Sequence, residues 1–238
     1  VIAPSRYTVD WFLSRRLVSP ARIHVVPSFV RAEDVIRRTP ETRAACRAEL
    51  GLGEADFAVA IIGKLGPRKN QEAIVPILQG LRERGVEARA MLFGGGTRTY
   101  TDGLRAKIAD AGLSDRIALM GHRNDARDLL PAFDALLCTS HDEQAPVVLV
   151  EAMAAGVPCV STPVGMAPDM IVPGETGTIL DLAAPGPALD YLAHLARNPG
   201  DVTRHGDAAR AIYDARLTAS GVMDEMERVF REVAEAAR

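Results

Sequence analysis

Short apolar runs alternate along most of the chain with longer stretches that have helical spacing. The runs are rich in Val, Ile and Leu, and Gly, Ser or Pro bounds each of them. Continuous apolar runs are typical of strands that are covered on both faces, whereas half-exposed strands alternate apolar and polar residues. The pattern therefore predicts buried strands over residues 58–65, 88–93, 116–120, 135–139, 158–162 and 178–180.

The stretches between these runs predict helices over residues 71–84, 101–111, 126–133 and 147–155. Pro76 lies inside the first of them and should kink or shorten it, because proline lacks the N–H that a helix interior needs. Strands that alternate with helices indicate βαβ units with right-handed crossovers. We expect an α/β fold, a Rossmann-like open parallel sheet with helices on both faces.

The two ends of the chain do not follow this alternation. Residues 9–16 predict a helix and residues 22–30 an extended piece, so the first 35 residues resemble a connector more than part of the sheet. After residue 184 the strands stop and the chain becomes helical. A final amphipathic helix is predicted over residues 222–237, forming a helical C-terminal tail. Its apolar stripe consists of Met223, Met226, Val229, Phe230 and Val233.

Composition narrows the class of protein. With 238 residues, 47% of them apolar, the chain can form one large or two small domains with a sizeable core. A formal charge of −3 argues against a dedicated nucleic-acid binder. The three cysteines are too scattered for a disulfide framework, and neither a membrane-spanning run nor a signal peptide is evident. We expect a cytoplasmic protein, and the opening without Met suggests a piece of a longer chain.

The most informative segment is residues 140–158. Pro146 fits the first turn of a helix and Gly156 its end. Between residues 145 and 155 the only charged residue is Glu151, so this helix should be buried. A buried carboxylate is costly unless it is paired, and Glu151 therefore needs a partner.

Glu143 lies eight positions before Glu151, just ahead of the same helix. Between the two acids is the helix N-terminus, whose unpaired N–H groups and dipole favour a phosphate. The first turn and Glu151 are separated by roughly 7.5 Å at 1.5 Å rise per residue. One acid would thus flank each side of a bound diphosphate, and carboxylates accept hydrogen bonds from sugar hydroxyls. A nucleotide sugar has this layout.

A basic turn at residues 63–70 follows residues 58–62 of the first predicted strand and opens the next helix. It lies at the carboxyl edge of the sheet, where open α/β folds bind ligands. Lys64, Arg68 and Lys69 could neutralise a diphosphate and stabilise it as a leaving group. The turn is not a Walker A loop, because no Gly-Lys-Ser/Thr ends it.

Taken together, these motifs resemble the retaining glycosyltransferases with the GT-B fold, in particular family 4. The Glu-x7-Glu-Ala-Met-Ala-x-Gly pattern at residues 143–156 is similar to the signature of that family, and the resemblance covers about residues 1–215. The order and spacing of the supporting motifs agree with it. Those motifs are Gly63-Lys64-Leu65, Lys69-Asn70, Leu92-Phe93-Gly94-Gly95-Gly96, Leu119-Met120-Gly121-His122, Asp134-Ala135-Leu136-Leu137 and Pro173-Gly174-Glu175-Thr176-Gly177.

The resemblance implies a role for each matching position. Glu143 would contact the donor sugar near the anomeric centre, and Glu151 would hold the ribose hydroxyls. Lys64, beside Gly63, would hold the diphosphate together with Lys69, which would also assist its departure. The remaining donor contacts would come from N–H groups around Gln144, Ala145 and Val147, and from His122 near the base.

The resemblance further implies transfer with retention from a UDP- or GDP-sugar to a carbohydrate or lipid-linked acceptor, without a metal ion or other cofactor. A front-side route, in which the leaving diphosphate accepts the incoming proton, is implied as well. Some relatives with lipid acceptors work at the inner face of a membrane. Two departures stand out: Lys64 replaces the commoner Arg, and Pro146, in Gln144-Ala145-Pro146, offers no N–H.

Length is the largest departure, since the family folds as two Rossmann-like domains. Residues 1–28 would be a stub of the N-terminal acceptor domain with the interdomain linker, and residues 29–220 the donor-binding domain. Residues 221–238 would form a helix that crosses back to the missing domain. The chain alone should bind the donor and transfer little or nothing.

Other interpretations stay open from the sequence. Glu151 could be a buried acid paired for structural reasons, Glu143 a solvated loop residue, and Lys64 and Lys69 surface charges. Residues 94–96 favour a tight turn over a dinucleotide motif, whose third glycine would fall at Thr99. The five histidines lack metal-ligand spacing. A non-catalytic nucleotide-sugar-binding module, a sugar-nucleotide epimerase, a phosphorylase and a redox domain remain the alternative functions.

Overall fold

A six-stranded parallel sheet forms the centre of the computed structural model, which describes residues 1–236. Its strands are β3 (Phe57–Ile62), β4 (Ala88–Phe93), β5 (Ile117–Gly121), β6 (Ala135–Cys138), β7 (Cys159–Ser161) and β8 (Gly177–Ile179). They lie in the order β5-β4-β3-β6-β7-β8, and every pair is parallel. Strands β3 to β5 follow one another toward one side of the sheet, and β6 to β8 follow one another toward the other side. The strand order therefore reverses between β3 and β6.

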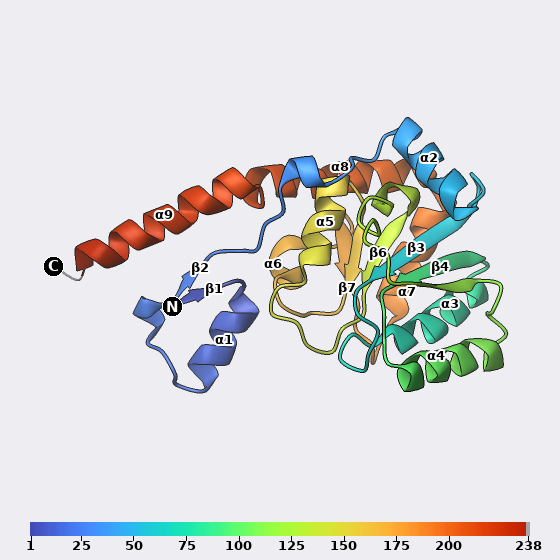
Figure 1. The fold of residues 1–238 in the computed structure, drawn as a ribbon, viewed down its shortest axis with the longest axis horizontal. Helices are drawn as coiled ribbons and strands as arrows, with labels where there is room; N and C mark the ends of the chain where they lie inside the picture. The colour runs from blue at the N-terminus through green and yellow to red at the C-terminus, as the bar shows by residue number, and fades with distance from the viewer. Residues whose placement is uncertain (237–238) are drawn as a thin grey trace.

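Helices cover both faces of the sheet, as Figure 1 shows. One face packs mainly on α3 (Ile74–Glu83), α4 (Arg98–Asp110) and α7 (Gly186–Arg197). The other packs mainly on α2 (Pro40–Leu50), α5 (Val147–Ala155) and α8 (Pro199–Arg216), with the short α6 (Ala167–Met170) beside them. Because both faces are covered, the strand residues are apolar in sequence rather than alternating. The predicted Rossmann-like α/β fold is confirmed.

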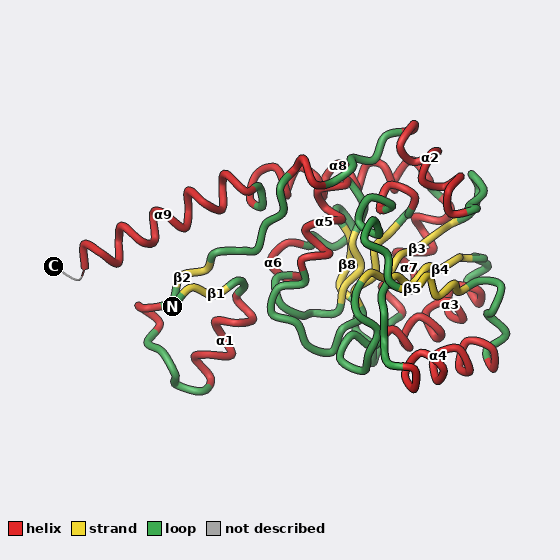
Figure 2. Tube along the Cα trace, in the orientation of Figure 1, coloured by secondary structure: helices red, strands yellow, loops and turns green. Residues whose placement is uncertain are grey.

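The ends of the chain lie outside this sheet. β1 (Ile2–Ala3) and β2 (His24–Val25) form a separate parallel pair, with α1 (Arg6–Ser14) between them. The last helix, α9 (Ala219–Ala236), extends away from the sheet (Figure 2) and packs on Val26 through Val222 and Val229. The predicted C-terminal helix is present, although Ala237 at its predicted end lies outside the described residues.

Several element predictions need correction. The helix predicted over residues 126–133 is wrong: the segment forms turns and a short 3-10 helix, Leu130–Ala132, because Pro131 cannot donate an N–H and β6 follows almost at once. The first helix begins at Arg6 rather than at residue 9, since the Ser5 side chain caps it by accepting the N–H of Thr8 at 3.2 Å.

We did not predict α2, although its boundaries follow from local signals. Thr39 and Thr42 form a reciprocal capping box, and Pro40 occupies the first turn. Gly51 ends the helix in the left-handed conformation. Pro76 behaves as expected, because α3 begins only at Ile74 and the proline lies in its first turn, after a 3-10 segment at Gln71–Ala73.

Candidate functional site

A cavity of about 700 Å3 opens at the carboxyl edge of the sheet, next to the point where the strand order reverses. We call it the Gly-rich cavity, because Gly63 and residues 94–96 form part of its wall. Ligands of open α/β sheets bind at such a switch point, outside the carboxyl ends of the strands. The lining residues are Ile62, Gly63, Lys64, Phe93, Gly94, Gly95, Gly96, Thr97, His122, Arg123 and Ala126.

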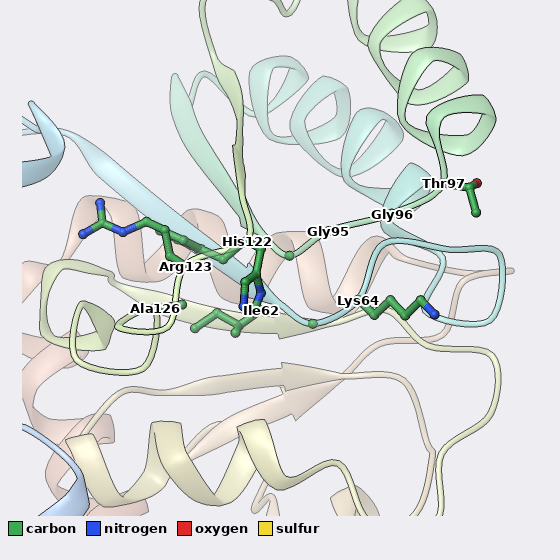
Figure 3. A pocket seen from close by; sticks show the side chains of 11 residues that line it. Ile62, Lys64, Gly95, Gly96, Thr97, His122, Arg123 and Ala126 are labelled. Carbon is green, nitrogen blue, oxygen red and sulfur yellow. The ribbon is translucent and has the colours of Figure 1, made fainter.

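Figure 3 shows how the side chains of this cavity are arranged. The ring of His122 points toward Ile62, and Arg123 points away from the glycine segment. Lys64 is exposed and comes from the turn after β3. The predicted donor residues Gly63, Lys64 and His122 therefore lie together around one cavity.

Glycine is required where the loops after β3 and β4 meet. Gly94 has φ of +146°, and an added Cβ would lie 2.0 Å from the carbonyl oxygen of Gly63. Main-chain bonds join the same two loops, with the N–H of Gly63 donating to Phe93 at 2.9 Å. The tight turn expected at residues 94–96 is not present: the segment is an extended loop in which Gly96 forms an isolated bridge with Leu65. This loop lines the cavity, which we did not predict.

Replacing Gly94 with alanine should destabilise the fold by about 3 kcal/mol, because backbone cannot move aside as a flexible side chain can. Chemical denaturation would measure the change. Gly103→Ala is the matched control: Gly103 lies within α4 with no atom near its Cβ position, so alanine should be neutral or stabilising. Equal stability of the Gly94 variant and the wild type would contradict the close approach.

Gln71 holds the basic turn in place although it is fully buried. Its side-chain amide donates to the carbonyl of Lys64 at 3.1 Å, and its oxygen accepts from the N–H of Gly66 at 3.1 Å. Tyr100 donates its hydroxyl to the same oxygen at 3.2 Å. The turn that carries Lys64 and Lys69 is thus fixed from within.

Lys69 and Glu143 form the charged centre at the switch point. Lys69 follows β3 and Glu143 follows β6, and their side chains form an ion pair. Arg68 adds a second contact, with Nη1 at 3.1 Å from the other Glu143 oxygen. The Lys69 Nζ also lies 3.7 Å from the Cβ position of Gly63, so the pair adjoins the wall of the Gly-rich cavity.

The carboxyl group of Glu143 is held in its ionised form. Burial alone raises its pKa, but the hydrogen bonds and charges of Lys69 and Arg68 outweigh burial and keep the pKa below its ordinary value. Ser140 also donates its hydroxyl to this carboxylate at 3.3 Å. The solvated loop acid that the sequence left open is excluded, since Glu143 is only 8% exposed. Arg68, which the sequence predicts to neutralise a diphosphate, contacts this acid.

Glu151 lies on α5 and is partly buried, as its position in an apolar helix predicts. The partner that it requires is Arg127, whose Nη1 lies 3.7 Å from Oε1. Burial raises the pKa of Glu151 above its ordinary value, against the opposing charge of Arg127. Glu151 does not line the Gly-rich cavity, but Arg127 directly follows Ala126, which does.

The start of α5 faces the N-terminal segment. Pro146 occupies the cap position without a side-chain hydrogen bond, and Val147, the first helical residue, is 40% exposed. Gln144 accepts a hydrogen bond from the Ser5 hydroxyl at 3.0 Å, and Tyr7 donates to Asp142 at 3.0 Å. Gln144, Ala145 and Val147 therefore lie at the helix N-terminus, as predicted, but outside the lining of the Gly-rich cavity. The contacts with Ser5 and Tyr7 were not predicted.

Comparison with known proteins agrees with this architecture. The model of the family of glycosyl transferases group 1 matches residues 42–212. The chain belongs to this family. The matched part of this group 1 family member runs from α2 to α8 and includes every strand of the main sheet.

Two individual relatives share about 30% of the aligned residues with this chain. D-inositol 3-phosphate glycosyltransferase of Mycolicibacterium vanbaalenii is 30% identical over 86% of this chain and 47% of its own length. The GDP-mannose-dependent alpha-(1-6)-phosphatidylinositol monomannoside mannosyltransferase of Mycolicibacterium smegmatis is 31% identical over 74% of this chain and 47% of its own length. This group 1 chain thus spans about half the length of these relatives.

Among solved structures, Anabaena HepE in complex with UDP and glucose superposes with a TM-score of 0.83. It is 22% identical, and the match covers 98% of this chain and 62% of that one. This likeness concerns the fold of the group 1 chain.

Within residues 1–236, each helix is too short or too polar to span a lipid bilayer.

Proposed function

We propose that this chain carries the donor-binding site of a retaining glycosyltransferase of family 4, which moves a sugar from a UDP- or GDP-sugar to an acceptor hydroxyl. The observation that carries the proposal is the Lys69–Glu143 ion pair, placed beside the Gly-rich cavity where the strand order reverses. A cation and an ionised acid in contact suit a substrate with a diphosphate joined to a sugar. Membership of the group 1 family supports the same class of reaction.

The donor's parts fit different walls of the site in this proposal. The base occupies the Gly-rich cavity near His122, and the ribose lies at the border of that cavity toward Glu151, which accepts hydrogen bonds from the ribose hydroxyls. The diphosphate lies against Lys64, Lys69 and the N-terminus of α5, where helix N–H groups favour an anion. Glu143 then faces the sugar near its anomeric carbon.

In the proposed reaction, the bond between the anomeric carbon and the diphosphate oxygen breaks while the acceptor oxygen bonds to the same face of that carbon. The acceptor proton passes to an oxygen of the leaving diphosphate. Lys64 and Lys69 balance the charge that develops on the leaving group, so we propose that no metal ion is required. Transfer that persists in a chelator would agree with this.

We further propose that residues 1–28 belong to an acceptor-binding domain and that α9 returns to that domain. UDP-glucose and GDP-mannose, the ligand of one similar structure and the donor in the name of one relative, are the first donors to test. The acceptor is a carbohydrate or a lipid-linked molecule. To distinguish these classes, sugar transfer by the full-length protein to lipid-linked acceptors in vesicles is compared with transfer to soluble carbohydrate acceptors.

The direct test is calorimetric titration of this chain with UDP, GDP, UDP-glucose, GDP-mannose and NAD. We expect one nucleoside diphosphate and the corresponding nucleotide sugar to bind, and we expect NAD not to bind. Binding of NAD alone would contradict the proposal and favour a redox domain. Retention is tested by NMR of the anomeric configuration of the product made by the full-length protein. Donor binding without transfer by that protein would favour a non-catalytic module, and conversion of the free nucleotide sugar an epimerase.

A further inference from the structure

The segment between β5 and β6 links the Gly-rich cavity to Glu151. Its first residues, His122 and Arg123, line the cavity, and the buried Ala126 lines it as well (Figure 3). Arg127 follows directly and reaches α5, where its Nη1 lies 3.7 Å from Oε1 of Glu151. One segment therefore contacts both the place that we propose for the base and the acid that we propose for the ribose.

The two arginines of this segment make different contacts. Arg123 is bonded within the segment and to α2: its Nε donates to Asp125 at 2.8 Å, and its guanidinium forms an ion pair with Glu49. Arg127 instead contacts Glu151 of α5. Arg123 thus anchors the segment to the fold, whereas Arg127 is directed at a residue of the candidate site.

Hydrogen bonding within the fold does not explain the position of Arg127. Its Nε is buried and has no acceptor within residues 1–236. A buried donor without an acceptor destabilises a fold, and native proteins retain few of them. Arg47, a buried arginine of α2, shows the contrast, because it donates to the carbonyls of Ala132 at 2.8 Å and Asp56 at 2.6 Å. Contact with Glu151 therefore explains the position of Arg127 better than stability does.

Glu151 depends on this contact for its charge. It is the only charged residue of α5, and its side chain is 18% exposed. Burial raises its pKa, the charge of Arg127 opposes this effect, and the charge of Asp128 raises the pKa further. Hydroxyl groups donate stronger hydrogen bonds to an ionised carboxylate than to a neutral acid. Loss of the Arg127 charge should therefore weaken a ribose contact without removing any atom of that contact.

We propose that Arg127 is a positioning residue for nucleotide binding, which acts on the ribose only through Glu151 by holding it as the charged acceptor of the ribose hydroxyls. This inference rests on the function proposed above, and it adds a residue that no sequence motif indicated. The ion pair uses Oε1 of Glu151, so we assign the ribose contact to Oε2. An ion pair that serves the fold alone is the alternative that the test must exclude.

The test is calorimetric titration of wild type and Arg127→Gln with UDP and GDP, at about pH 6 and at about pH 8. At the lower pH the replacement should weaken binding by about two- to fivefold, as expected for one partly exposed ion pair. At the higher pH the loss should be smaller, because more of Glu151 is ionised there. Comparison of variant and wild type at the same pH cancels the titration of every group that both retain. Arg127→Lys keeps the positive charge and should restore the wild-type affinity. Equal losses at the two pH values, or no rescue by lysine, would overturn the proposal.

A double-mutant cycle with Glu151→Gln separates action through Glu151 from direct contact with the nucleotide. In the Glu151→Gln background, Arg127→Gln should have no further effect on affinity, because the carboxyl group on which Arg127 acts is gone. Losses that add would mean that Arg127 binds the nucleotide itself, and would overturn the positioning role. Thermal unfolding of each variant verifies that it is folded.

Arg123→Gln is the matched control, since it removes a charge from the same segment and its ion pairs are with Glu49 and Asp125. Any loss that it causes should be equal at the two pH values, and a loss confined to the lower pH would count against a specific role of Arg127. The titrations also separate the two proposals. A wild-type chain that binds neither nucleotide contradicts the donor site and this inference together. Nucleotide binding that is the same in wild type and Arg127→Gln overturns the inference alone.

Discussion

Lys69→Ala should weaken the binding of UDP or GDP by about 1.5 to 3 kcal/mol while leaving the binding of uridine or guanosine nearly unchanged. The ammonium group lies beside Gly63 in the wall of the Gly-rich cavity and contacts Glu143. Its charge would act on the phosphates, which the nucleosides lack. Calorimetric titration of the four ligands measures the difference.

Lys107→Ala provides the control for this experiment. Lys107 is an exposed lysine of α4 that pairs with Glu72 and does not line the Gly-rich cavity. Its replacement should change neither class of ligand, because exposed ion pairs contribute little. An equal loss for nucleosides and nucleoside diphosphates in the Lys69 variant would show that Lys69 does not bind phosphate.

Glu151→Ala should weaken the binding of UDP or GDP by about 1.5 to 3 kcal/mol, the range for a hydrogen bond to a charged group. In contrast to Lys69→Ala, the loss should also appear with the nucleosides, because the proposed contact is with the ribose. The 2′-deoxynucleosides are the matched control ligands. Because they lack one ribose hydroxyl, their affinity should fall less when Glu151 is replaced. Unchanged affinity in a folded variant would contradict the ribose contact.

The stability of Glu151→Gln separates a binding role from a structural one. Burial raises the pKa of Glu151 in the folded chain. Ionisation of this carboxyl group therefore lowers the free energy of unfolding as the pH rises from the ordinary Glu pKa through the raised one. The glutamine variant avoids this cost and should be more stable than the wild type at pH 7, with the gain absent below about pH 4. Thermal unfolding across this pH range measures it. A less stable variant at pH 7 would mean that the Arg127 contact is worth more than the burial cost.

The sequence predicted the strands well because burial on both faces leaves a simple apolar signal. Helices with ambiguous periodicity were harder: residues 126–133 looked helical, yet Pro131 and the early start of β6 prevent it. The apolar spacing does not reveal the helix α2, because its buried face carries Arg47 between Cys46 and Leu50, although Thr39 and Gly51 mark both its ends. Apolar spacing thus outweighed capping signals in our interpretation, and here the caps were the better guide.

The candidate site was predicted in part. The sequence predicts that Lys64, Lys69 and Glu143 lie at one edge of the sheet, because the carboxyl ends of parallel strands meet at the same edge. The direct contact between Lys69 and Glu143 could not be predicted, since it depends on β3 and β6 being neighbours. Strand order is a tertiary property with no local signal. The same holds for the ion pairs of Asp134 with Arg43 and Arg47 of α2, which are distant from it in sequence.

The hydrogen bonds from Ser5 and Tyr7 to the loop before α5 make that loop a shared boundary between two parts of the molecule. A rigid rotation of α1 would carry the carbonyl of Gln144 and the carboxylate of Asp142 with it, and Glu143 lies between them. If a ligand next to Glu143 binds one orientation of α1 more tightly than another, then that orientation must favour the ligand by the same free energy.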